Sequence, residues 1–520
     1  MRLIPEKNAV LFNLNKPQRV LTAIPTSKPI THPRYNVAVP YNVEEVKLLR
    51  NLGVPIPAPI HHQYGWPGKF KPFQAQKQTA AMLTVNTRAF VLNEVGTGKS
   101  MAVLWAYDYL RSIGMANKLL VSAPLSTLER TWGDEIFTHM PHLTFSVLYG
   151  NKQQRTKALA VDADIYIVNH HGISVLLEQL KARADITHVA VDEIAVLRNQ
   201  RTALWKAHNA VVNKSGRRVT VWGMTGTPTP NQPTDAWAQS KLVTPSVAPR
   251  SFMKFRDMTM RQCGPYKWIP RRDAIKTVQS IMVPAVRYTR DECMDLPDCM
   301  YETREVPLSR EQEIAYKSMT ARLVAEADEG KILAVNEAVK ANKLVQIAAG
   351  IAYNIDGREV NLNAKPRLDE LRAVVDATTH KIIVFVPYRA TVHMVRAYLE
   401  SNGYTVGVVY GEISKTQRDR TFSSFQKTDA PRILLAQPAA MSHGLTLTAA
   451  NTIVWYAPIM SNDIYEQANG RITRPGQANK QYIVHLQGTP VESRIYTRLR
   501  EKQSMQGVLL DAVKKDRKVA

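Results

Sequence analysis

Two series of short apolar runs, separated by a segment that lacks them, constrain the fold of this chain more than any other feature. The runs alternate with helical stretches from Phe70 to about Pro245, and again from Pro366 to about Gln503. They read AFVLN, LLVSAP, IYIVN, HVAVDE and VTVWGMTG in the first series, and KIIVFVP, TVGVVYG, ILLAQP, TIVWYAP and QYIVHL in the second. Such alternation is typical of parallel sheets with helices on both faces. We therefore predict an α/β protein with two such sheets.

The predicted domains follow from this pattern. The two α/β domains are expected at residues 67–246 and 366–503. Residues 1–66 form a small N-terminal α+β region, with strand-like RVLTAIPT and NVAVP, a helix at Val43 to Leu52 and a Pro-rich linker, VPIPAPI. Residues 247–365 form an insertion that is basic at first and then helical from about Ser309 to Asn354, and residues 504–520 form a basic tail.

The charge of the chain favours a polyanionic partner. Lys and Arg number 68 against 44 Asp and Glu, which gives a net charge of +24. Nucleic acid is the expected partner, and an anionic membrane surface is the alternative that charge leaves open. The cysteines Cys263, Cys293 and Cys299 have no metal-ligand spacing, so reduced thiols and a cytoplasmic location are expected. A signal peptide and a membrane-spanning apolar run are both absent from the sequence.

The stretch NEVGTGKS, from Asn93 to Ser100, has the sequence of a phosphate-binding loop. It follows an apolar run and precedes a helical stretch, Met101 to Leu110. Glycines let the backbone bend so that its NH groups face phosphates, the lysine can reach the β and γ phosphates, and the serine hydroxyl can bind Mg²⁺. A Gly-rich surface turn is the alternative. The predicted nucleotide-binding residues here are Glu94, Val95, Gly96, Thr97, Gly98, Lys99 and Ser100.

Two carboxylates end a later apolar strand, in HVAVDEIAVLRN. Asp192 can hold magnesium together with Ser100, and Glu193 can polarise the attacking water. A solvated strand end is the alternative, which the preceding phosphate loop disfavours. Lys99, Asp192 and Glu193 are therefore predicted to be catalytic, with ATP and Mg²⁺ as the bound groups.

Two further positions complete the expected nucleotide chemistry of the first domain. Thr225, Gly226 and Thr227 follow another strand, where their hydroxyls could relay the state of the triphosphate to bound nucleic acid. Gln74, in KPFQAQKQ, has an amide that could recognise both hydrogen-bonding edges of adenine. A simple turn and an exposed glutamine are the respective alternatives.

The second domain carries QANGRITRPGQ, which includes Gln467, Gly470 and Gln477. Its Arg471 and Arg474 are three residues apart, so on a helix they would share a face and could point at one γ-phosphate. Arginine at that place stabilises the charge that grows during phosphoryl transfer. A solvated basic helix face is the alternative. If both arginines act, hydrolysis depends on closure of two domains.

The insertion begins with a basic and aromatic segment. Ten Lys or Arg lie between Arg250 and Arg290, against Asp257 and Asp273. The interleaved aromatics are Phe252, Phe255, Tyr266, Trp268 and Tyr288. Such a mixture can neutralise phosphates and stack on bases, and Trp268, Arg271 and Arg272 are the candidate contacts. A small aromatic core with a charged surface is the alternative.

The ordered motifs resemble those of superfamily 2 helicases and translocases, specifically the Swi/Snf-like branch. The resemblance covers about Lys69 to Gln503 and rests on KPFQ, GTGKS, APLSTLERTW, VDEIAVLRN, TGTPTPN, SREQEIAYKSM, KIIVFVPYRATVHMVRAYL, SHGLTLTAANTIVWYAP and QANGRITRPGQ. It implies two tandem RecA-like domains that close around ATP. It also implies that Gln467 and Gly444 contact the nucleotide, and that Ser126, Thr127 and Thr446 contact the nucleic-acid backbone, while Trp132 packs. The segment GLTLTAA resembles the annealing helicases of this branch more than the chromatin remodellers.

This chain departs from that family at three places. Ile194 and Ala195 follow the acidic pair where the family has Gly-His or Ala-His, so one side chain that couples hydrolysis to DNA is absent. Asn93 replaces Ala or Gly, which we expect to tighten the entrance of the loop. The run from Met441 to His443 stands where the family is Gly-rich. The small size fits a bacterial or phage enzyme.

The sequence thus predicts a DNA-dependent ATPase that moves along or remodels duplex or branched DNA, acting as a monomer. An RNA helicase or remodeller is the alternative enzyme, because backbone contacts discriminate poorly between DNA and RNA. A non-catalytic nucleic-acid-binding scaffold is the alternative from another class. Residues 1–66 are a candidate specificity module for forks or junctions.

Overall fold

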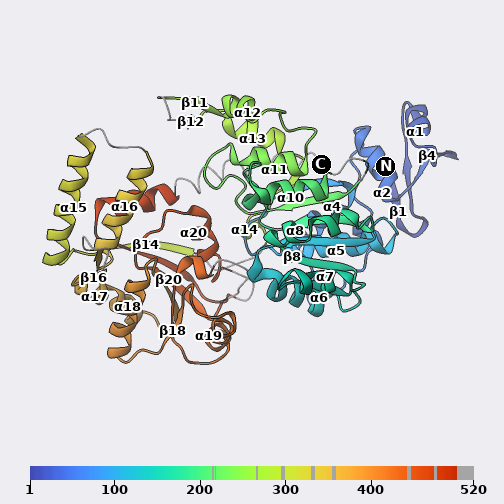
Figure 1. Ribbon diagram of the computed structural model, residues 1–520. Helices are drawn as coiled ribbons and strands as arrows, with labels where there is room; N and C mark the ends of the chain where they lie inside the picture. The colour runs from blue at the N-terminus through green and yellow to red at the C-terminus, as the bar shows by residue number, and fades with distance from the viewer. Residues whose placement is uncertain are drawn as a thin grey trace. The chain divides into compact units, whose positions relative to one another are not determined.

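The computed structural model describes residues 1–213, 216, 218–264, 268–293, 299–328, 334–353, 359–441, 447–473 and 477–500. The chain forms two compact units that divide between Met294 and Asp295. Each unit contains one large parallel sheet with its own helices (Figure 1). The predicted α/β class with two parallel sheets is therefore confirmed.

The sheet of the first unit has seven parallel strands in the order β13-β5-β10-β9-β6-β8-β7. The strands are β5 (Arg88–Val91), β6 (Lys118–Ala123), β7 (Phe145–Leu148), β8 (Ile165–Asn169), β9 (Ile186–Val191), β10 (Thr220–Met224) and β13 (Ala285–Val286). The five apolar runs of the first series form β5, β6, β8, β9 and β10. These strands are the central part of the sheet, which explains their continuous apolar sequences.

Helices cover both faces of this sheet. They are α4 (Gln74–Val85), α5 (Lys99–Ser112), α6 (Asp134–His139), α7 (Lys152–Ala160), α8 (His170–Val175), α9 (Leu177–Ala182), α10 (Ala203–Val212) and α11 (Asp235–Val243). Short helical turns are η2 (Leu125–Thr127), η3 (Leu128–Gly133) and η4 (Ile194–Leu197). Ala89 and Val91 of β5 belong to the core shared with α4 and α5, whereas Phe90 belongs to the core shared with α10 and α11. Successive residues of each strand thus fill two different cores.

The N-terminal region is an antiparallel sheet with helices, as predicted, but one element differs. Its strands β1 (Arg2–Ile4), β2 (Ala9–Phe12), β3 (Lys28–His32) and β4 (Tyr35–Pro40) pair in the order β1-β2-β4-β3, with η1 (Pro5–Lys7), α1 (Pro17–Ala23), α2 (Val43–Asn51) and α3 (Ile60–Gln63). The strand predicted for RVLTAIPT is wrong, because most of it lies in α1. Pro17 occupies the first turn of that helix, where its fixed φ is favourable.

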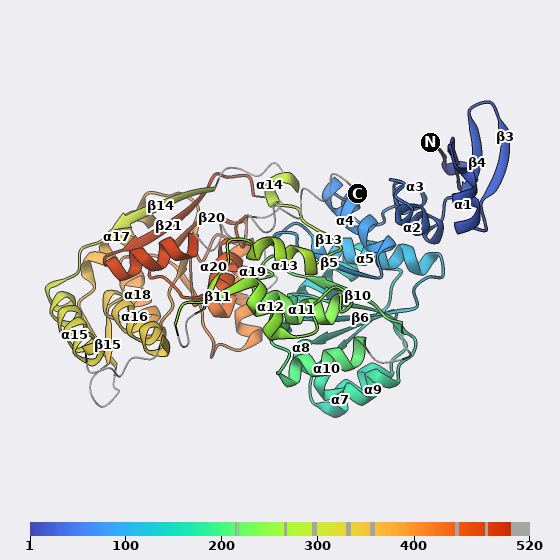
Figure 2. The same cartoon turned by 90° about the horizontal axis from the view of Figure 1, so that it is seen from above.

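The N-terminal region is also not a separate module. Ile56, Ala58 and Ile60 of the expected linker are 2%, 0% and 0% exposed and belong to the core of the first unit. Helices α2 and α3 pack on α4 (Figure 2). The Pro-rich segment is therefore a buried connection whose apolar residues alternate with prolines.

The expected insertion contributes to both large sheets. Its first part contains α12 (Phe252–Thr259), the antiparallel pair β11 (Met260–Gln262) and β12 (Trp268–Pro270), α13 (Ala274–Ile281), and β13 at the edge of the first sheet, followed by α14 (Arg290–Cys293). Its second part begins with β14 (Cys299–Glu305), which pairs with β21 in the second unit. The sequence did not indicate these two edge strands, because each is short or polar.

The sheet of the second unit has six parallel strands in the order β14-β21-β20-β17-β19-β18. The strands of the second apolar series are β17 (Lys381–Phe385), β18 (Val406–Val409), β19 (Ile433–Ala436), β20 (Ala450–Trp455) and β21 (Gln481–Gln487). The other elements are α15 (Arg310–Asp328), α16 (Ala334–Ala348), β15 (Ile351–Tyr353), β16 (Glu359–Asn361), α17 (Lys365–Asp376), α18 (Arg389–Ser401), α19 (Lys415–Lys427), η5 (Pro438–Met441) and α20 (Asn462–Asn469). Helices α15 and α16 confirm the helical part predicted for the insertion.

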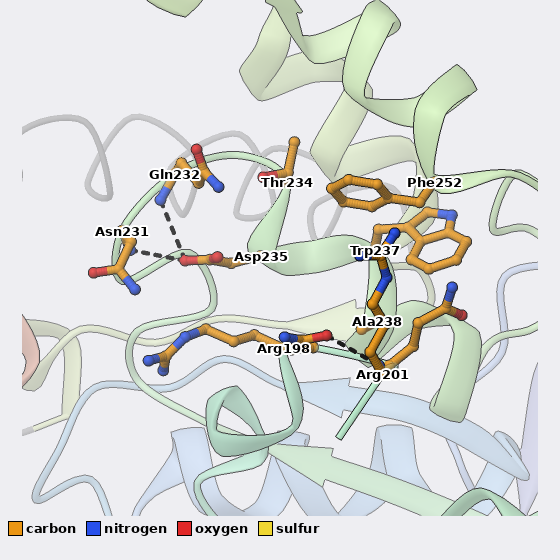
Figure 3. Close-up of a pocket in the computed structure, with 11 residues that line it drawn as sticks. Arg198, Arg201, Asn231, Gln232, Thr234, Asp235, Trp237, Ala238 and Phe252 are labelled. Carbon is orange, nitrogen blue, oxygen red and sulfur yellow. Dashed lines mark hydrogen bonds between the residues drawn. The ribbon is translucent and has the colours of Figure 1, made fainter. Parts of the chain in front are cut away.

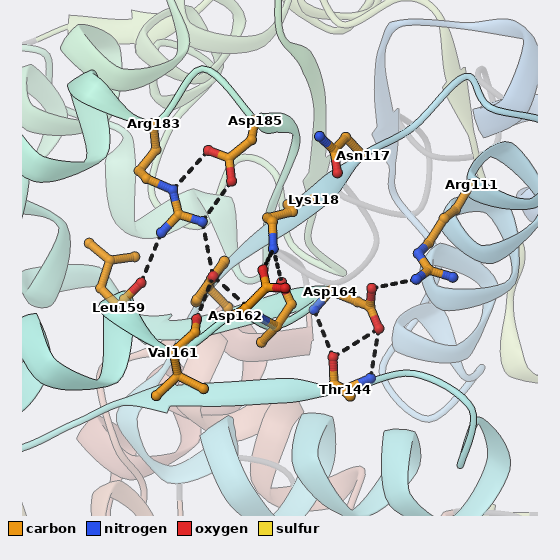
Figure 4. Close-up of polar contacts among 12 residues, drawn as sticks. Arg111, Asn117, Lys118, Thr144, Leu159, Val161, Asp162, Asp164, Arg183 and Asp185 are labelled. Atoms are coloured by element: carbon orange, nitrogen blue, oxygen red, sulfur yellow. Dashed lines mark hydrogen bonds and ion pairs between the residues drawn. The ribbon is translucent and has the colours of Figure 1, made fainter.

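Charged side chains gather at the amino ends of three strands of the first sheet (Figure 4). Asp164 precedes β8, pairs with Arg111 at 2.5 Å and accepts the backbone N–H of Thr144 at 2.9 Å. Arg183 and Asp185, just before β9, pair at 2.7 Å. These contacts join loops at the edge formed by the amino ends of the strands. In open α/β sheets, ligands bind at the other edge, beyond the carboxyl ends of the strands. We therefore read them as structural.

Candidate functional site

The loop after β5 has the strand, turn and helix context that a phosphate-binding loop requires. Gly96 and Gly98 adopt φ values of +90° and +74°, and Gly98 directly precedes α5. A Cβ at Gly98 would lie 2.0 Å from Nε2 of Gln76, so only glycine fits there without displacement. The first N–H groups of α5 lack helical partners and form the positive end of the helix. The loop therefore combines a bend that requires glycine with a helix terminus suited to phosphate.

Lys99 lies against the loop that precedes it. Its Nζ donates to the backbone oxygens of Asn93 at 3.0 Å and Glu94 at 3.2 Å. Thr97 Oγ1 donates to the same Glu94 oxygen at 2.9 Å. The ammonium group is thus held at the loop by uncharged backbone oxygens, and negatively charged phosphate oxygens would be stronger acceptors for it.

The buried side chain of Asn93 links the start of the loop to two other segments. It is 2% exposed, its Nδ2 donates to Thr79 Oγ1 and its Oδ1 accepts the N–H of Tyr288, both at 2.9 Å. It therefore connects α4 with the segment after β13. These contacts hold Asn93 in place, and a tighter loop entrance stays a prediction.

Arg287 also contacts this loop, and its role differs from the sequence interpretation. It is 3% exposed, donates through Nη1 to Leu92 O at 2.9 Å and pairs through Nη2 with Glu94 Oε1 at 2.6 Å. Its position in the sequence places it among the ten Lys or Arg of the basic and aromatic segment, which is a candidate nucleic-acid contact. Buried against the phosphate loop, it is instead a structural residue of the nucleotide site.

The predicted acidic pair ends β9 and is largely buried. Asp192 Oδ2 accepts the indole N–H of Trp132 and Oδ1 accepts the N–H of Glu193, both at 3.1 Å. Burial raises the pKa of Asp192, and the nearby Lys99 charge and the Trp132 hydrogen bond oppose that rise. Glu193 has φ +48°, a left-handed conformation that is uncommon for a residue other than glycine. Burial and nearby groups thus shift the pKa of Asp192 in opposite directions, and the backbone of Glu193 is strained. Both features are common at functional sites.

The TGT turn after β10 lies beside both preceding elements. Thr225 is 0% exposed and its Oγ1 donates to Glu193 Oε2 at 3.3 Å, while Thr227 N–H donates to Thr225 Oγ1 at 3.1 Å. A Cβ on Gly226 would lie 3.4 Å from the backbone nitrogen of Val95. Since β5, β10 and β9 are neighbours in the sheet, their three loops converge at one edge. The sequence predicts that Thr225 and Thr227 relay the state of the triphosphate to nucleic acid and contact it, but both are buried in the interior of this loop cluster.

The adenine candidate Gln74 is the exposed first residue of α4. Its neighbour Gln76 is buried, accepts the N–H of Phe73 at 2.9 Å and lies against Gly98. The sequence analysis missed Gln76. Its only sequence signal is the spacing of three residues from Phe73, which matches a helix-capping pattern.

Only part of the predicted second-unit site lies within the described residues. Gln467 is 5% exposed in α20 and donates to Asp463 Oδ1 at 3.1 Å. Arg471 is 1% exposed and lies in the turn after α20, which ends at Asn469, so the helical placement expected for Arg471 is wrong. Gly444, Thr446 and Arg474 lie outside the described residues.

The predicted backbone contacts on the first unit differ in exposure. Ser126 is exposed, whereas Thr127 is 5% exposed and its hydroxyl donates to Pro124 O at 2.9 Å. A buried hydroxyl with an internal acceptor is unsuited to phosphate. Ser126 remains the candidate of this pair, and Thr127 is a structural residue.

The aromatic residues of the basic segment are divided between core and surface. Phe255 is 0% exposed and belongs to a core, and Tyr288 is also buried. Trp268 is half-buried, with the guanidinium of Arg256 3.9 Å from its ring centroid. Arg271 is exposed and donates through Nε to Met260 O at 3.1 Å. The alternative of a small aromatic core holds for Phe255 and Tyr288, whereas contact of Trp268 and Arg271 with nucleic acid stays a prediction, and Tyr266 lies outside the described residues. Arg272 is exposed.

Residues that follow the acidic pair and the TGT turn along the chain line a pocket of about 440 Å³ (Figure 3). Asp235 accepts the backbone N–H of Asn231 at 2.8 Å and of Gln232 at 3.2 Å, so its charge is matched locally. Arg198 and Arg201 also line the pocket, and the exposed Phe252 forms an aromatic wall, packed edge-on against Trp237. The sequence analysis did not identify this pocket, because its residues come from three separate segments.

The residues present fit a magnesium nucleotide. Ser100 and Asp192 supply the oxygen ligands that Mg²⁺ prefers, Lys99 supplies a positive charge at the loop, and Gly96 and Gly98 supply the backbone bend before α5. A phosphate-binding loop and an acidic pair on neighbouring loops of a parallel sheet, together with a second parallel α/β unit, define a nucleotide-hydrolysing protein of the helicase type.

The particular family follows from comparison with known proteins. Residues 76–356 match the SNF2-related domain, and residues 366–476 match the helicase conserved C-terminal domain. The chain belongs to the SNF2-related family. It is an ATP-dependent helicase or translocase of the Swi/Snf-like type within superfamily 2, and nucleic acid is its class of partner.

Individual relatives are distant. Protein p41 of Acyrthosiphon pisum secondary endosymbiont phage 1 is 25% identical over 467 residues, covering 82% of this chain and 95% of p41. The ATP-dependent DNA helicase DDM1 of Arabidopsis thaliana is 22% identical over 485 residues, covering 85% of this chain and 62% of DDM1. The solved SWI2/SNF2 ATPase core of Sulfolobus solfataricus in complex with dsDNA is 21% identical, covers 86% of this chain and 94% of that chain, and has a TM-score of 0.41. Within the described residues, none of the helices has the length and apolar composition needed to cross a membrane.

Proposed function

We propose that this protein hydrolyses ATP at the loop cluster of the first unit and uses that energy to move along duplex or branched DNA. The observation that carries the proposal is the convergence of three loops, after β5, β9 and β10, with Glu193 bonded to Thr225 and Asp192 influenced by Lys99. Each loop carries one part of the chemistry of phosphoryl transfer.

The proposed roles follow from these contacts. Lys99 exchanges its backbone acceptors for β- and γ-phosphate oxygens, and the N–H groups at the start of α5 bind the same phosphates. Ser100 and Asp192 would hold Mg²⁺, whose charge would offset that of the phosphate oxygens. Glu193 accepts a proton from the attacking water, and its hydrogen bond from Thr225 fixes its orientation. Gln74 recognises adenine through its amide.

The second unit supplies the remaining proposed residues. Arg471 and Arg474 stabilise the charge that develops on the transferred phosphoryl group, and Gln467 and Gly444 contribute to nucleotide binding. This assignment rests on their family motif. Its consequence is that hydrolysis requires both units.

Duplex or branched DNA is the proposed partner. The net charge of +24 supports a polyanion, and the relative DDM1 is named as a DNA helicase. Ser126, Thr446, Trp268, Arg271 and Arg272 are the proposed contacts with the DNA backbone. Arg198 and Arg201 extend this set, because their pocket is cationic and adjoins the loops of the acidic pair. Contacts of this kind position the duplex without reading its sequence.

The test is ATP turnover at one fixed salt concentration, with duplex, forked and single-stranded DNA and with single-stranded RNA, for the wild type and Lys99→Ala. We expect stimulation by duplex or forked DNA in the wild type. Lys99→Ala should abolish turnover and retain salt-sensitive DNA binding, because Lys99 acts on phosphates of the nucleotide. Stimulation by RNA alone would establish the RNA enzyme instead. Absence of turnover with all of them, or unchanged turnover in Lys99→Ala, would overturn the proposed mechanism.

A further inference from the structure

Trp132 does more than fill the core of the first unit. The side chain is 0% exposed, as its predicted packing role requires, and its single polar atom has a specific partner. The indole Nε1–H donates to Asp192 Oδ2 at 3.1 Å. A core residue of the segment after β6 thus contacts the carboxylate proposed to hold Mg²⁺.

The backbone around Trp132 has an unusual conformation. Trp132 lies in η3, a single π-helical turn that directly follows η2. Isolated π-helical turns are rare and occur often at functional sites. Leu125, at the start of η2, is 52% exposed, and the proposed DNA contact Ser126 is exposed beside it. One short segment therefore carries an exposed surface at one end and the Asp192 partner at the other.

The strand that leads into this segment is firmly held. The backbone N–H of Asp192 donates to Ser122 O at 2.8 Å. The Ser122 hydroxyl is 2.9 Å from both His170 Nδ1 and His208 Nε2, and all three side chains are buried. The end of β6 is thus fixed, so displacement of residues 125–133 reaches Asp192 through the Trp132 side chain.

The two hydrogen bonds of Asp192 fix the orientation of its carboxylate. The Trp132 N–H donates to Oδ2 and the Glu193 N–H donates to Oδ1, both at 3.1 Å, so together they limit rotation of the carboxylate. Ile194 and Ala195, which follow the acidic pair, are buried and apolar, so neither offers a polar side chain to it.

We propose that Trp132 is a positioning residue that couples DNA binding by residues 125–133 to the geometry of the Mg²⁺ ligand Asp192. The inference rests on the proposed function and adds a regulatory contact to it. When DNA contacts the exposed end of the segment, the position of η3 changes the hydrogen bond that orients Asp192. Hydrolysis thereby becomes sensitive to DNA.

The test compares Trp132→Phe with Trp205→Phe. Phenylalanine removes the N–H and keeps most of the ring packing. Trp205 is a matched control, since it is 9% exposed and its Nε1 donates to the backbone oxygen of Ala238 at 2.8 Å, away from the acidic pair. The full chain is used, and ADP binding is measured by calorimetry with Mg²⁺ and with excess chelator, alongside ATP turnover with and without duplex DNA.

We expect Trp132→Phe to weaken Mg²⁺-dependent ADP binding by about tenfold, the typical effect of losing an outer hydrogen bond to a metal ligand. Binding in chelator should be unchanged, and the stimulation of turnover by DNA should fall by a similar factor. Trp205→Phe should retain both properties. Trp132→His, which restores a ring N–H, should recover part of the loss.

Wild-type Mg²⁺ dependence and DNA stimulation in Trp132→Phe would overturn the proposal, as would equal losses in Trp205→Phe. If Trp132→Phe does not fold, Trp132→His carries the same comparison, because its donor predicts retained Mg²⁺ dependence. Absence of ATP turnover in the wild type would refute the proposed function alone. The Mg²⁺ dependence of ADP binding would still decide whether Trp132 positions Asp192.

Discussion

At the scale of single residues, the backbone of Glu193 shows how the site departs from ordinary sequence rules. A glutamate at φ +48° lies in a region that glycine, asparagine and aspartate occupy more readily. The conformation turns the chain directly after β9 into η4 and allows the Glu193 carboxylate to accept the Thr225 hydroxyl. Such strain persists where the surrounding contacts maintain it.

The Ser122 cluster defines the tautomers of two buried histidines. His208 Nδ1 is 2.8 Å from the backbone oxygen of Leu204, so Nδ1 carries the proton. His208 Nε2 then accepts the Ser122 hydroxyl, and His170 Nδ1 must donate to the same oxygen. In this arrangement His208 is neutral, and a proton on Nε2 would force the Ser122 hydroxyl to turn its hydrogen away from His208.

The first prediction concerns the pH dependence of stability. Burial lowers the pKa of His208 from 6.5 to about 4. The unfolded chain therefore takes up a proton as pH falls below 6.5, while the folded chain does not. The contribution of neutral His208 to the free energy of unfolding is thus complete above pH 6.5 and is lost as pH falls towards 4. The loss from this residue is on the order of 3 kcal/mol.

The measurement is urea unfolding of the wild type and His208→Gln at pH 7.5, 6 and 5. His208→Gln should be less stable at pH 7.5 but should lose less stability on acidification. His171→Gln, at an exposed neighbouring position, should retain the wild-type dependence. An identical dependence in His208→Gln would show that His208 does not titrate as inferred.

At the scale of elements, α5 is the helix on which the nucleotide site depends. Gly98 precedes its first residue and Gly114 follows its end, and both have φ +74°. Their surroundings differ, because a Cβ on Gly114 meets nothing within 4 Å, whereas one on Gly98 meets Gln76 at 2.0 Å. Replacement of Gly114 by alanine therefore adds backbone strain alone, whereas replacement of Gly98 adds the same strain and a steric contact with Gln76.

The second prediction uses this pair. Gly114→Ala should cost about 1–2 kcal/mol of unfolding free energy through its left-handed φ alone and should retain nucleotide binding. Gly98→Ala should weaken nucleotide binding, because it adds the same left-handed strain within the loop and the methyl group displaces the Gln76 amide, which accepts the N–H of Phe73. Thermal unfolding and binding of a fluorescent ATP analogue distinguish the two variants, and normal binding in Gly98→Ala would contradict the proposed loop geometry.

At the scale of the whole molecule, each unit has its own hydrophobic core. The second unit also buries an ion pair, in which Arg367 binds Glu492 through two hydrogen bonds of 2.8 and 2.9 Å. Arg367 Nη1 also donates to Tyr456 O at 2.6 Å, and Glu492 accepts the N–H of Gly488 at 2.9 Å. The pair thereby joins α17 to the helical segment that follows β21, and Gly488 ties the loop between them to Glu492.

The third prediction follows from the burial of this pair. Glu492→Gln should destabilise the second unit by about 3–5 kcal/mol, because Arg367 keeps a buried charge without its partner. Glu412→Gln breaks the exposed Arg389 pair and should cost at most about 1 kcal/mol. In calorimetry we expect Glu492→Gln to lower one unfolding transition and leave the transition of the first unit unchanged. Equal effects of the two substitutions would contradict the importance of burial.

Local pattern determined the larger elements of this protein. The ten apolar runs are strands of the two sheets, and the helices of residues 310–348 lie where the sequence predicts them. The phosphate loop was also recognisable, since its glycines, Lys99 and Ser100 are consecutive and its chemistry depends on adjacent residues. The strand predicted for RVLTAIPT failed because its short apolar run is equally compatible with a buried helix face, and Pro17 favours the helix.

The tertiary structure alone decided which distant side chains meet. Trp132 reaches Asp192, Arg287 reaches Glu94, and Asn93 joins Thr79 to Tyr288. These partners are 14 to 195 residues apart, and no local periodicity specifies such pairs. Strand order brings them together, because the parallel sheet places loops from distant segments at one edge. The sequence by itself therefore determined the elements and the family's chemistry, whereas packing determined the electrostatic surroundings in which that chemistry takes place.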